Sequence, residues 1–333
     1  MGLGFVCELT PRCSLDCAFC YNVWKDAPAS MPAELPAASW EKILDSILDA
    51  ATPEWIAFAG GEPLASPDLP RIVRHVHDRS PRTRIGVASN GLSLTREVLD
   101  GLIEAGLSHV ELPLFTLDAG RYERLTGHDC PDQVKRAITA VTESAASLTI
   151  AVTLLPDERD DLDIVLRYAH ALGADRIALN RFVPTGRGAV WDARLDDVGR
   201  EAVLDDQLVR ADAFAAARDL MLDVTIPVED CLHPHDRFPN LRFHPCVCGE
   251  TKWVIDPSGR LRTCEQNRDV LGDLTARPPA ELLGSADVAE FSRRTLKPEC
   301  PECARWSVCR GGCRFTHARV RFRRMGATPL VIG

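Results

Sequence analysis

The stretch RCSLDCAFCYN, Arg12 to Asn22, places three cysteines within a few residues of one another near the start of the chain. Cys13, Cys17 and Cys20 follow the spacing C-x3-C-x2-C, with no fourth cysteine beside them. Thiolates hold iron-sulfur clusters, and a four-iron cluster with three protein ligands leaves one iron free to bind a small molecule. A structural zinc site closes with four ligands, so zinc would also need Cys7 or a distant histidine. The spacing therefore predicts a metal centre, with a catalytic four-iron cluster and a zinc site as the two interpretations.

The segments around this stretch alternate between strand-like and helix-like patterns. Apolar runs of strand length occur at residues 5–10, 55–60, 84–90, 109–115, 148–155 and 176–182. Stretches with apolar residues at helical spacing lie between or after them, at 39–51, 94–106, 132–145, 161–173 and 201–221. Strands buried on both faces and joined by helices are typical of parallel sheets with right-handed crossovers. The pattern predicts an α/β fold, either a barrel or a doubly wound sheet.

The alternation ends near residue 220, and the composition then changes. From Cys231 onward the chain is rich in Cys, Pro, Arg and Gly. The segment KWVIDPSGRLRTC, residues 252–264, has a Pro-Ser-Gly turn between two short strand-like runs, which predicts a hairpin. We therefore predict two domains, residues 1–225 and 226–333.

Composition and charge exclude several classes of protein. The chain has 333 residues, of which 45% are hydrophobic, and a formal net charge of −9, which argues against a nucleic-acid surface. No segment resembles a signal peptide or an apolar run long enough to span a membrane. An odd number of cysteines, thirteen, in a chain of this size without an export signal favours metal ligation over disulfides. We expect a cytoplasmic protein with no nucleic-acid and no membrane partner.

Three motifs resemble those of the radical S-adenosylmethionine (radical SAM) superfamily. CSLDCAFCYN resembles its cluster motif, C-x3-C-x-aromatic-C, with Phe19 at the aromatic position. AGGEPL, residues 59–64, ends the second predicted strand and is similar to the GGE motif of the family. ASNGLSL, residues 88–94, ends the third, where Ser89 and Asn90 match ribose and carboxylate contacts of the family, with an Asx-type loop start as the alternative. The resemblance extends over nearly the whole chain and implies a partial (β/α)6 TIM-like barrel.

The resemblance also implies a reaction and a set of cofactor contacts. In this family a 4Fe-4S cluster binds S-adenosylmethionine and cleaves it reductively, giving a 5′-deoxyadenosyl radical that abstracts a substrate hydrogen. The thiols of the cysteine stretch would be the catalytic cluster ligands, and Glu62 would receive the methionine amino group, although an ordinary turn is the alternative. Asn180 and Arg181 would touch cofactor or substrate, a salt-bridged loop being the alternative for Arg181. The implied cofactor contacts are Phe19, Tyr21, Gly60, Gly61, Glu62, Ser89, Asn90, Asn180 and Arg181.

The cysteine-rich C-terminal region resembles a SPASM domain, the extension that carries auxiliary iron-sulfur clusters in peptide-modifying radical SAM enzymes. Zinc ribbons are the alternative for such paired cysteines. By the resemblance, one or two auxiliary clusters would be bound, the first by Cys246, Cys248, Cys264 and Cys313 and the second by Cys300, Cys303 and Cys309. The family's last cysteine, downstream of Cys313, is absent, so the second cluster would have another ligand, leave an iron open or be missing. His317, Cys231, a carboxylate, water and the substrate are the candidates.

The leading functional expectation from the resemblance is modification of a ribosomally made peptide by crosslinking, oxidation or epimerisation, with flavodoxin or ferredoxin as electron donor. A radical SAM oxidoreductase acting on a small molecule or tetrapyrrole is one alternative, since no peptide-recognition extension precedes Cys13. A non-catalytic zinc or iron-sulfur protein is the other. Of the remaining cysteines, Cys7 is expected in the core, while the roles of Cys130 and Cys231 stay open.

Overall fold

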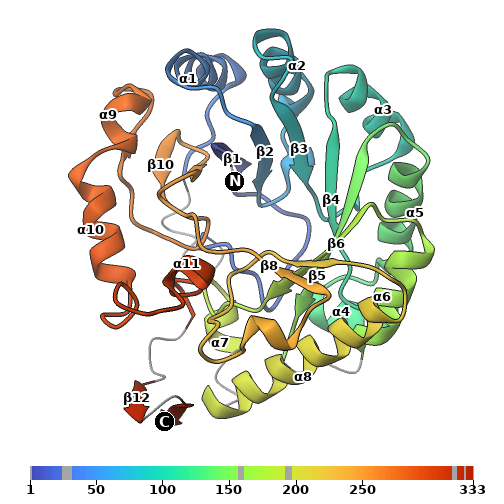
Figure 1. The fold of residues 1–333 in the computed structure, drawn as a ribbon. Helices are drawn as coiled ribbons and strands as arrows, with labels where there is room; N and C mark the ends of the chain where they lie inside the picture. Colours follow the sequence, from blue (N-terminus) through green and yellow to red (C-terminus); the bar gives the residue numbers. More distant parts are fainter. Residues whose placement is uncertain are drawn as a thin grey trace.

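The computed structural model describes residues 2–24, 32–156, 161–191, 197–316, 321–325 and 328–332. Its centre is a parallel sheet in which neighbouring strands follow one another in chain order (Figure 1). A doubly wound sheet reverses its strand order at a switch point, whereas a barrel wall does not. The prediction of six parallel strands is confirmed: β1 Gly4–Thr10, β2 Trp55–Gly60, β3 Arg84–Ala88, β4 His109–Pro113, β5 Ser147–Leu154 and β6 Arg176–Arg181.

Helices cover the outer side of this wall (Figure 1). In α1, the apolar stripe of Trp40, Ile43, Leu44 and Ile47 is buried against the sheet, as its helical spacing predicts. The helix α2 was not predicted from the sequence. The helices of the barrel are α1 Ala37–Ala50, α2 Leu69–Arg79, α3 Arg96–Glu104, α4 Ala119–Thr126, α5 Pro131–Thr142, α6 Leu162–Ala171, α7 Gly188–Trp191 and α8 Asp197–Ala216.

The sheet continues beyond both ends of the six-stranded wall. Past β6 it adds β7 Leu222–Val224 and β8 Leu241–Phe243, both parallel. At the other edge β9, Lys252–Ile255, pairs in parallel with β1, and the hairpin partner of β9 is β10, Arg260–Arg262. The predicted hairpin is thereby confirmed. The predicted domain boundary at residue 225 falls between β7 and β8, which are neighbours in one sheet. Strands of the C-terminal part therefore extend the barrel sheet at both of its edges.

The remaining C-terminal elements are short. Figure 1 shows α9 and α10 beside β10. The short C-terminal elements are η5 His235–Arg237, β11 Gly272–Asp273, α9 Pro279–Leu283, α10 Ala286–Thr295, α11 Trp306–Cys309, β12 Arg321–Met325 and β13 Thr328–Ile332. None of the helices in the described part of the chain is both long and apolar enough to cross a membrane.

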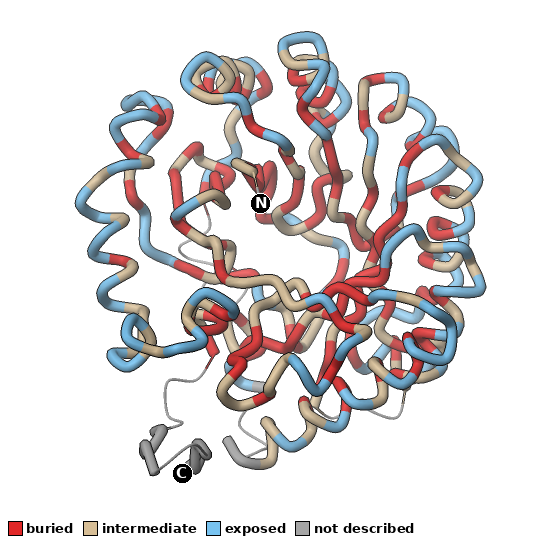
Figure 2. Tube along the Cα trace, viewed as in Figure 1, coloured by how far each residue is buried: buried red, intermediate tan, exposed pale blue. Residues whose placement is uncertain are grey.

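Buried residues follow the strands and the inner sides of the helices, while exposed residues lie on the outside (Figure 2). The core also contains charged side chains: Arg262 of β10 is fully buried and forms an ion pair with Glu8 of β1. The Arg262 guanidinium also donates to the Asn267 carbonyl (2.9 Å) and lies 4.8 Å from the centre of the Trp24 ring. Breaking a buried pair leaves an uncompensated charge, so this contact ties the C-terminal hairpin to the first strand.

The end of β2 touches the chain that follows β1. The Gly61 N–H donates to the Thr10 carbonyl and the Glu62 N–H to the Arg12 carbonyl, each at 2.7 Å. A Cβ atom placed on Gly61 would lie 2.1 Å from the Arg12 oxygen. Only glycine permits this approach of two backbones.

We therefore predict that Gly61→Ala lowers the free energy of unfolding by at least about 2 kcal/mol, because neither backbone segment can move aside freely. Gly101→Ala is the matched control. Gly101 lies inside α3, and apart from its chain neighbours and the backbone of its own helix nothing lies within 4 Å of the place that a Cβ atom would take, so alanine should stabilise by about 0.5–1 kcal/mol. Chemical denaturation of both variants measures the difference, and equal stability of Gly61→Ala and the unsubstituted protein would contradict the prediction.

Candidate active site

The cysteine loop, residues 11–24, follows the carboxyl end of β1 and is held by backbone hydrogen bonds. The Asp16 N–H donates to the Thr126 carbonyl (2.8 Å) and the Ala18 N–H to the Leu125 carbonyl (3.0 Å), both at the end of α4. Its three cysteines are half-buried. The carboxyl ends of parallel barrel strands are where such folds build active sites, so the loop presents three thiols at the expected end of the barrel.

The surroundings of these thiols fit an iron-sulfur cluster. The Leu15 N–H donates to Cys13 Sγ (3.4 Å), and the side-chain amide of Asn90 donates to the same sulfur (3.7 Å). Such donors stabilise a thiolate and tune the potential of a cluster. Among the described residues, no group of three or more His, Cys, Asp or Glu side chains is arranged to hold a metal ion. The choice between a cluster and zinc therefore rests on the cysteine spacing and on the neighbouring motifs.

Glu62 joins two of the predicted cofactor motifs. Its side chain, 2% exposed, accepts hydrogen bonds from the Ser89 hydroxyl (2.8 Å), the Asn90 N–H (2.7 Å) and the Leu64 N–H (3.1 Å). Burial raises the pKa of the Glu62 carboxyl, and these three donors oppose the shift. A carboxylate has about four acceptor positions, so at most one remains for a ligand. The ammonium contact of Glu62 stays a prediction, and the structure gives Glu62 a second role in holding the loop after β3.

Asn90 connects that loop to the cysteine loop. Its side-chain amide donates to the Ser14 hydroxyl (3.2 Å) as well as to the Cys13 sulfur, and its carbonyl oxygen accepts from the Leu92 N–H (2.9 Å). Asn22 donates to the Gly60 carbonyl (3.3 Å) from the other end of the cysteine loop. Three segments that are far apart in the sequence therefore meet, and they are the three that carry the predicted motifs.

The aromatic residues of the cysteine loop face two different surroundings. The Phe19 ring is buried and packs edge-to-face against Phe115, with ring centres 4.8 Å apart. Tyr21 is 43% exposed, yet burial and then the charges of Glu265 and Glu8 raise its pKa well above the usual value. The cofactor contacts of Phe19 and Tyr21 stay predictions.

Asn180 and Arg181 lie at the end of β6, where both have protein partners. Arg181 is buried, forms an ion pair with Glu229 and donates to the Glu201 carboxylate (2.7 Å). The Asn180 carbonyl oxygen accepts from the Thr225 hydroxyl. Arg181 therefore forms salt bridges in the structure, as the alternative interpretation of this residue expects. A contact of Arg181 with a cofactor or substrate stays a prediction.

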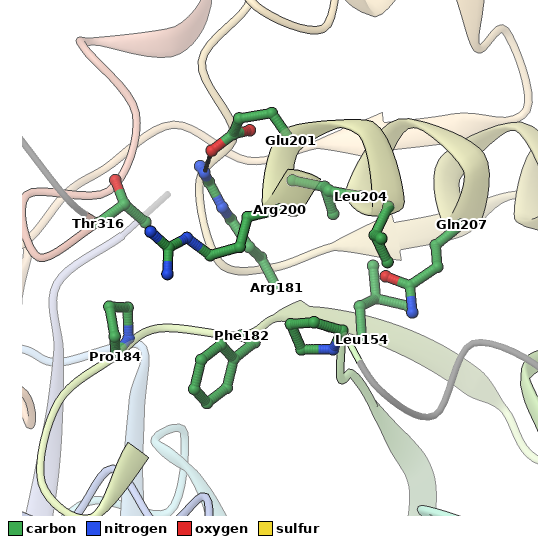
Figure 3. A pocket seen from close by; sticks show the side chains of 11 residues that line it. Leu154, Arg181, Phe182, Pro184, Arg200, Glu201, Leu204, Gln207 and Thr316 are labelled. Atoms are coloured by element: carbon green, nitrogen blue, oxygen red, sulfur yellow. Dashed lines mark hydrogen bonds and ion pairs between the residues drawn. The ribbon is translucent and has the colours of Figure 1, made fainter. Parts of the chain in front are cut away.

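A pocket lies at this end of the barrel. Figure 3 shows the hydrogen-bonded ion pair of Arg181 and Glu201 in the pocket wall, together with Phe182 and Pro184. The Phe182 side chain belongs to the same small buried cluster as Phe19, so the pocket adjoins the cysteine loop. Its lining residues are Leu154, Pro156, Arg181, Phe182, Pro184, Arg200, Glu201, Val203, Leu204, Gln207 and Thr316.

Cys246, Cys248, Cys264 and Cys313, the first predicted auxiliary set, influence one another's pKa values. A hydrogen bond from the Cys248 thiol lowers the pKa of Cys246 to about 6, helped by the charge of Arg314. Hydrogen bonds with Cys246 and Cys264 raise the pKa of Cys248. Burial, followed by the charges of Cys264 and Cys246, raises the pKa of Cys313 to about 12. Their ligation of a cluster stays a prediction.

The second predicted set, Cys300, Cys303 and Cys309, lies in one compact turn. The Cys303 N–H donates to the Cys300 carbonyl (3.1 Å). Burial raises the pKa of the Cys300 thiol, and the charges of Cys309 and Cys303 add to the shift against that of Lys297. His317, a candidate fourth ligand, lies outside the described residues.

Sequence reasoning missed the charged residues inside the barrel. Besides Glu8 and Arg262, Lys252 of β9 forms an ion pair with Glu265 (2.7 Å), and Glu265 accepts from the Cys264 thiol (3.5 Å). The sequence indicates one of these residues: Glu8 lies within the apolar run FVCELT, and a charged residue in a buried strand needs a partner. Cys7 is fully buried, which confirms its expected place in the core, while Cys130 is buried and Cys231 half-buried.

Comparison with protein families gives one match to the barrel. Residues 7–169 match the model described as the radical SAM superfamily. The match begins in β1 and ends in α6, so it includes the cysteine loop, Glu62 and the loop after β3.

The chain is also similar to curated proteins over most of its length. It is 27% identical to a PqqA peptide cyclase of Streptomyces rochei over 321 residues, covering 93% of this chain and 84% of the relative. It is 26% identical to a PqqA peptide cyclase of Methylocella silvestris, covering 94% of this chain and 82% of the relative.

Two solved structures share the fold. Streptococcus suis SuiB bound to the precursor peptide SuiA superposes with a TM-score of 0.75 at 16% identity, over 94% of this chain and 72% of SuiB. The anSMEcpe protein with bound AdoMet superposes with a TM-score of 0.72 at 15% identity, over 94% of this chain and 86% of that protein. These superpositions extend the similarity of fold past residue 169 into the C-terminal part.

We predict that Glu62→Ala weakens the binding of S-adenosylmethionine by about one to two orders of magnitude, because a charge-assisted hydrogen bond contributes roughly 1.5–3 kcal/mol. The variant also removes the acceptor of the Ser89 and Asn90 bonds. Equilibrium binding to the iron-loaded protein measures the affinity, with iron content as the control for an intact cluster. An unchanged affinity would assign Glu62 to an ordinary turn.

Proposed function

The chain is a radical SAM enzyme, and we propose that its substrate is a ribosomally synthesised peptide in which it forms a crosslink. The relatives named PqqA peptide cyclase, which match the chain over nearly its full length, support a peptide substrate and a bond-forming reaction. The observation that carries the proposal is the meeting of three half-buried thiols with the network of Glu62, Ser89 and Asn90 at the barrel's carboxyl end.

The side chains of the barrel have distinct tasks in this proposal. A 4Fe-4S cluster with S-adenosylmethionine supplies a 5′-deoxyadenosyl radical by reductive cleavage of the sulfonium. Cys13, Cys17 and Cys20 would hold this cluster, and the Asn90 amide would fix the orientation of Cys13. Glu62 holds the loop of Asn90 in place and has one acceptor position left for the ammonium of the cofactor. A flavodoxin or a ferredoxin would donate the electron for this cleavage.

The barrel interior provides an enclosed place for the reaction. Phe19 and Phe115 pack edge-to-face beside the cysteine loop. A primary carbon radical must be kept from solvent, and an enclosed site does this. The pocket beside Phe182 adjoins the loop, which makes it the candidate entry for a peptide side chain.

We further propose that the C-terminal part binds auxiliary clusters. The four thiols of Cys246, Cys248, Cys264 and Cys313 are close enough to shift one another's pKa values. Lys252 pairs with Glu265, and against the effect of burial the charges of Glu265, Cys248 and Cys264 raise the pKa of Lys252 well above its usual value. An auxiliary cluster held by these cysteines would lie beside this ion pair.

Replacing Cys13, Cys17 and Cys20 together by alanine should abolish formation of 5′-deoxyadenosine, because the cluster would lose all its protein ligands. Chromatography of anaerobic reactions with reductant and S-adenosylmethionine measures the product. Cys130→Ala is the control, since Cys130 lies in none of the proposed ligand sets. Product formation by the triple variant at the normal rate would refute the cluster assignment.

Incubation with reductant, S-adenosylmethionine and peptides encoded beside the gene should give a peptide lighter by the mass of two hydrogen atoms, because a crosslink between two residues removes one hydrogen from each. Tandem mass spectrometry then locates the bond, as fragmentation stops between the joined residues. Cleavage of S-adenosylmethionine in the presence of every candidate peptide, with no peptide altered, would favour a small-molecule substrate instead.

A further inference from the structure

The loop after β7, residues 225–234, is fastened to the cysteine-rich turn near the end of the chain. Asp230 is 3% exposed and accepts from the Arg305 guanidinium (2.8 Å). Glu229 is 2% exposed and accepts from Lys297 Nζ (3.1 Å) and from the Thr316 hydroxyl (3.0 Å). These bonds hold the backbone immediately before Cys231 against the segment that contains Cys300, Cys303 and Cys309.

Two glycines let the segments approach closely. Gly311 and Gly312 have φ values of +85° and +71°, which favour glycine. A Cβ atom on Gly312 would lie 2.6 Å from Glu229, and one on Gly311 would lie 3.2 Å from the Cys300 sulfur. Because neither glycine has a side chain, the loop after β7 and Cys300 can both pack directly against the backbone of this pair. The Cys313 N–H adds a bond to the Pro227 carbonyl (3.1 Å).

Cys231 directly follows Asp230, which accepts from Arg305, a residue that lies between Cys303 and Cys309 in the chain. Lys297, three residues before Cys300, donates to Glu229. These hydrogen bonds hold Cys231 beside the segment of the second cysteine set. In agreement with this placement, burial raises the pKa of Cys231 to about 12, and the charges of Cys309 and Cys300 add to the shift.

We propose that Cys231 is the fourth thiolate ligand of the auxiliary iron-sulfur cluster held by Cys300, Cys303 and Cys309. This inference rests on the proposed binding of auxiliary clusters by the C-terminal part. Four thiolates close a cluster, so this one would have no iron open to substrate and would serve electron transfer. Lys297 and Arg305 lie beside the thiols, where their positive charges offset that of the cluster.

The test compares the iron content and spectra of Cys231→Ala and Cys231→Ser after anaerobic reconstitution without peptide. Cys231→Ala should lose up to one cluster of iron and sulfide, or show the spectrum of a cluster that has lost one iron. Cys231→Ser should keep more iron but change the electron paramagnetic resonance signal, because an oxygen ligand replaces sulfur. Formation of 5′-deoxyadenosine without peptide should persist in both. Cys130→Ala and His317→Ala are the matched controls and should retain the normal iron content and signal.

Each outcome decides the proposal. Normal iron content and an unchanged signal in both Cys231 variants would overturn it, and a loss confined to His317→Ala would assign the fourth ligand to that histidine. If Cys231→Ala does not fold, Cys231→Ser supplies the decision. The readouts need no peptide, so a protein that shows the expected cluster loss but modifies no peptide would refute only the proposed function. Unsubstituted protein with iron for the catalytic cluster alone would refute the proposed auxiliary sites and this inference together.

Discussion

The position of β1 in the sheet is the constraint on which the rest of the molecule depends. This strand pairs with β2 on one side and β9 on the other, and its end leads directly into the cysteine loop. The buried pair of Glu8 and Arg262 adds a charged contact between β1 and the C-terminal hairpin. Any shift of β1 would move the thiols relative to both the cofactor motifs and the auxiliary cysteines.

A second connection between the two parts is electrostatic. Arg181, at the end of β6, pairs with Glu229, and Glu229 pairs with Lys297 beside the last cysteine turn. Buried charges are costly unless each has a partner, and here the partners come from the barrel, the loop after β7 and the C-terminal segment. The network therefore fixes the pocket wall and the cysteine-rich turn by the same contacts.

Local patterns predicted the parts of the fold that repeat. The six strands and the stripe of α1 have clear periods, whereas β7 and β8 have three residues each, too few to show one. At α2, Pro67 just before the helix and Pro70 in its first turn resemble loop signals, although proline is compatible with the first turn of a helix. The spacing of the cysteines predicted a metal centre from the sequence. The hydrogen bonds of Glu62 could not be predicted, because they join loops that follow different strands and meet only in the tertiary structure. The hydrogen bonds of Glu229 and Asp230 with the last cysteine-rich segment could not be predicted for the same reason.

The pairing of β9 with β1 has a consequence for biosynthesis. The two strands are separated by most of the chain, a contact of high sequence separation that forms slowly. During translation the barrel strands emerge first, with the edge of β1 open to association with other chains until residue 255 has been made. Glu8 likewise has no cationic partner until Arg262 arrives. Truncation after the sixth barrel strand would therefore leave a protein prone to aggregate, and chaperones that shield an open sheet edge would favour maturation of the full chain.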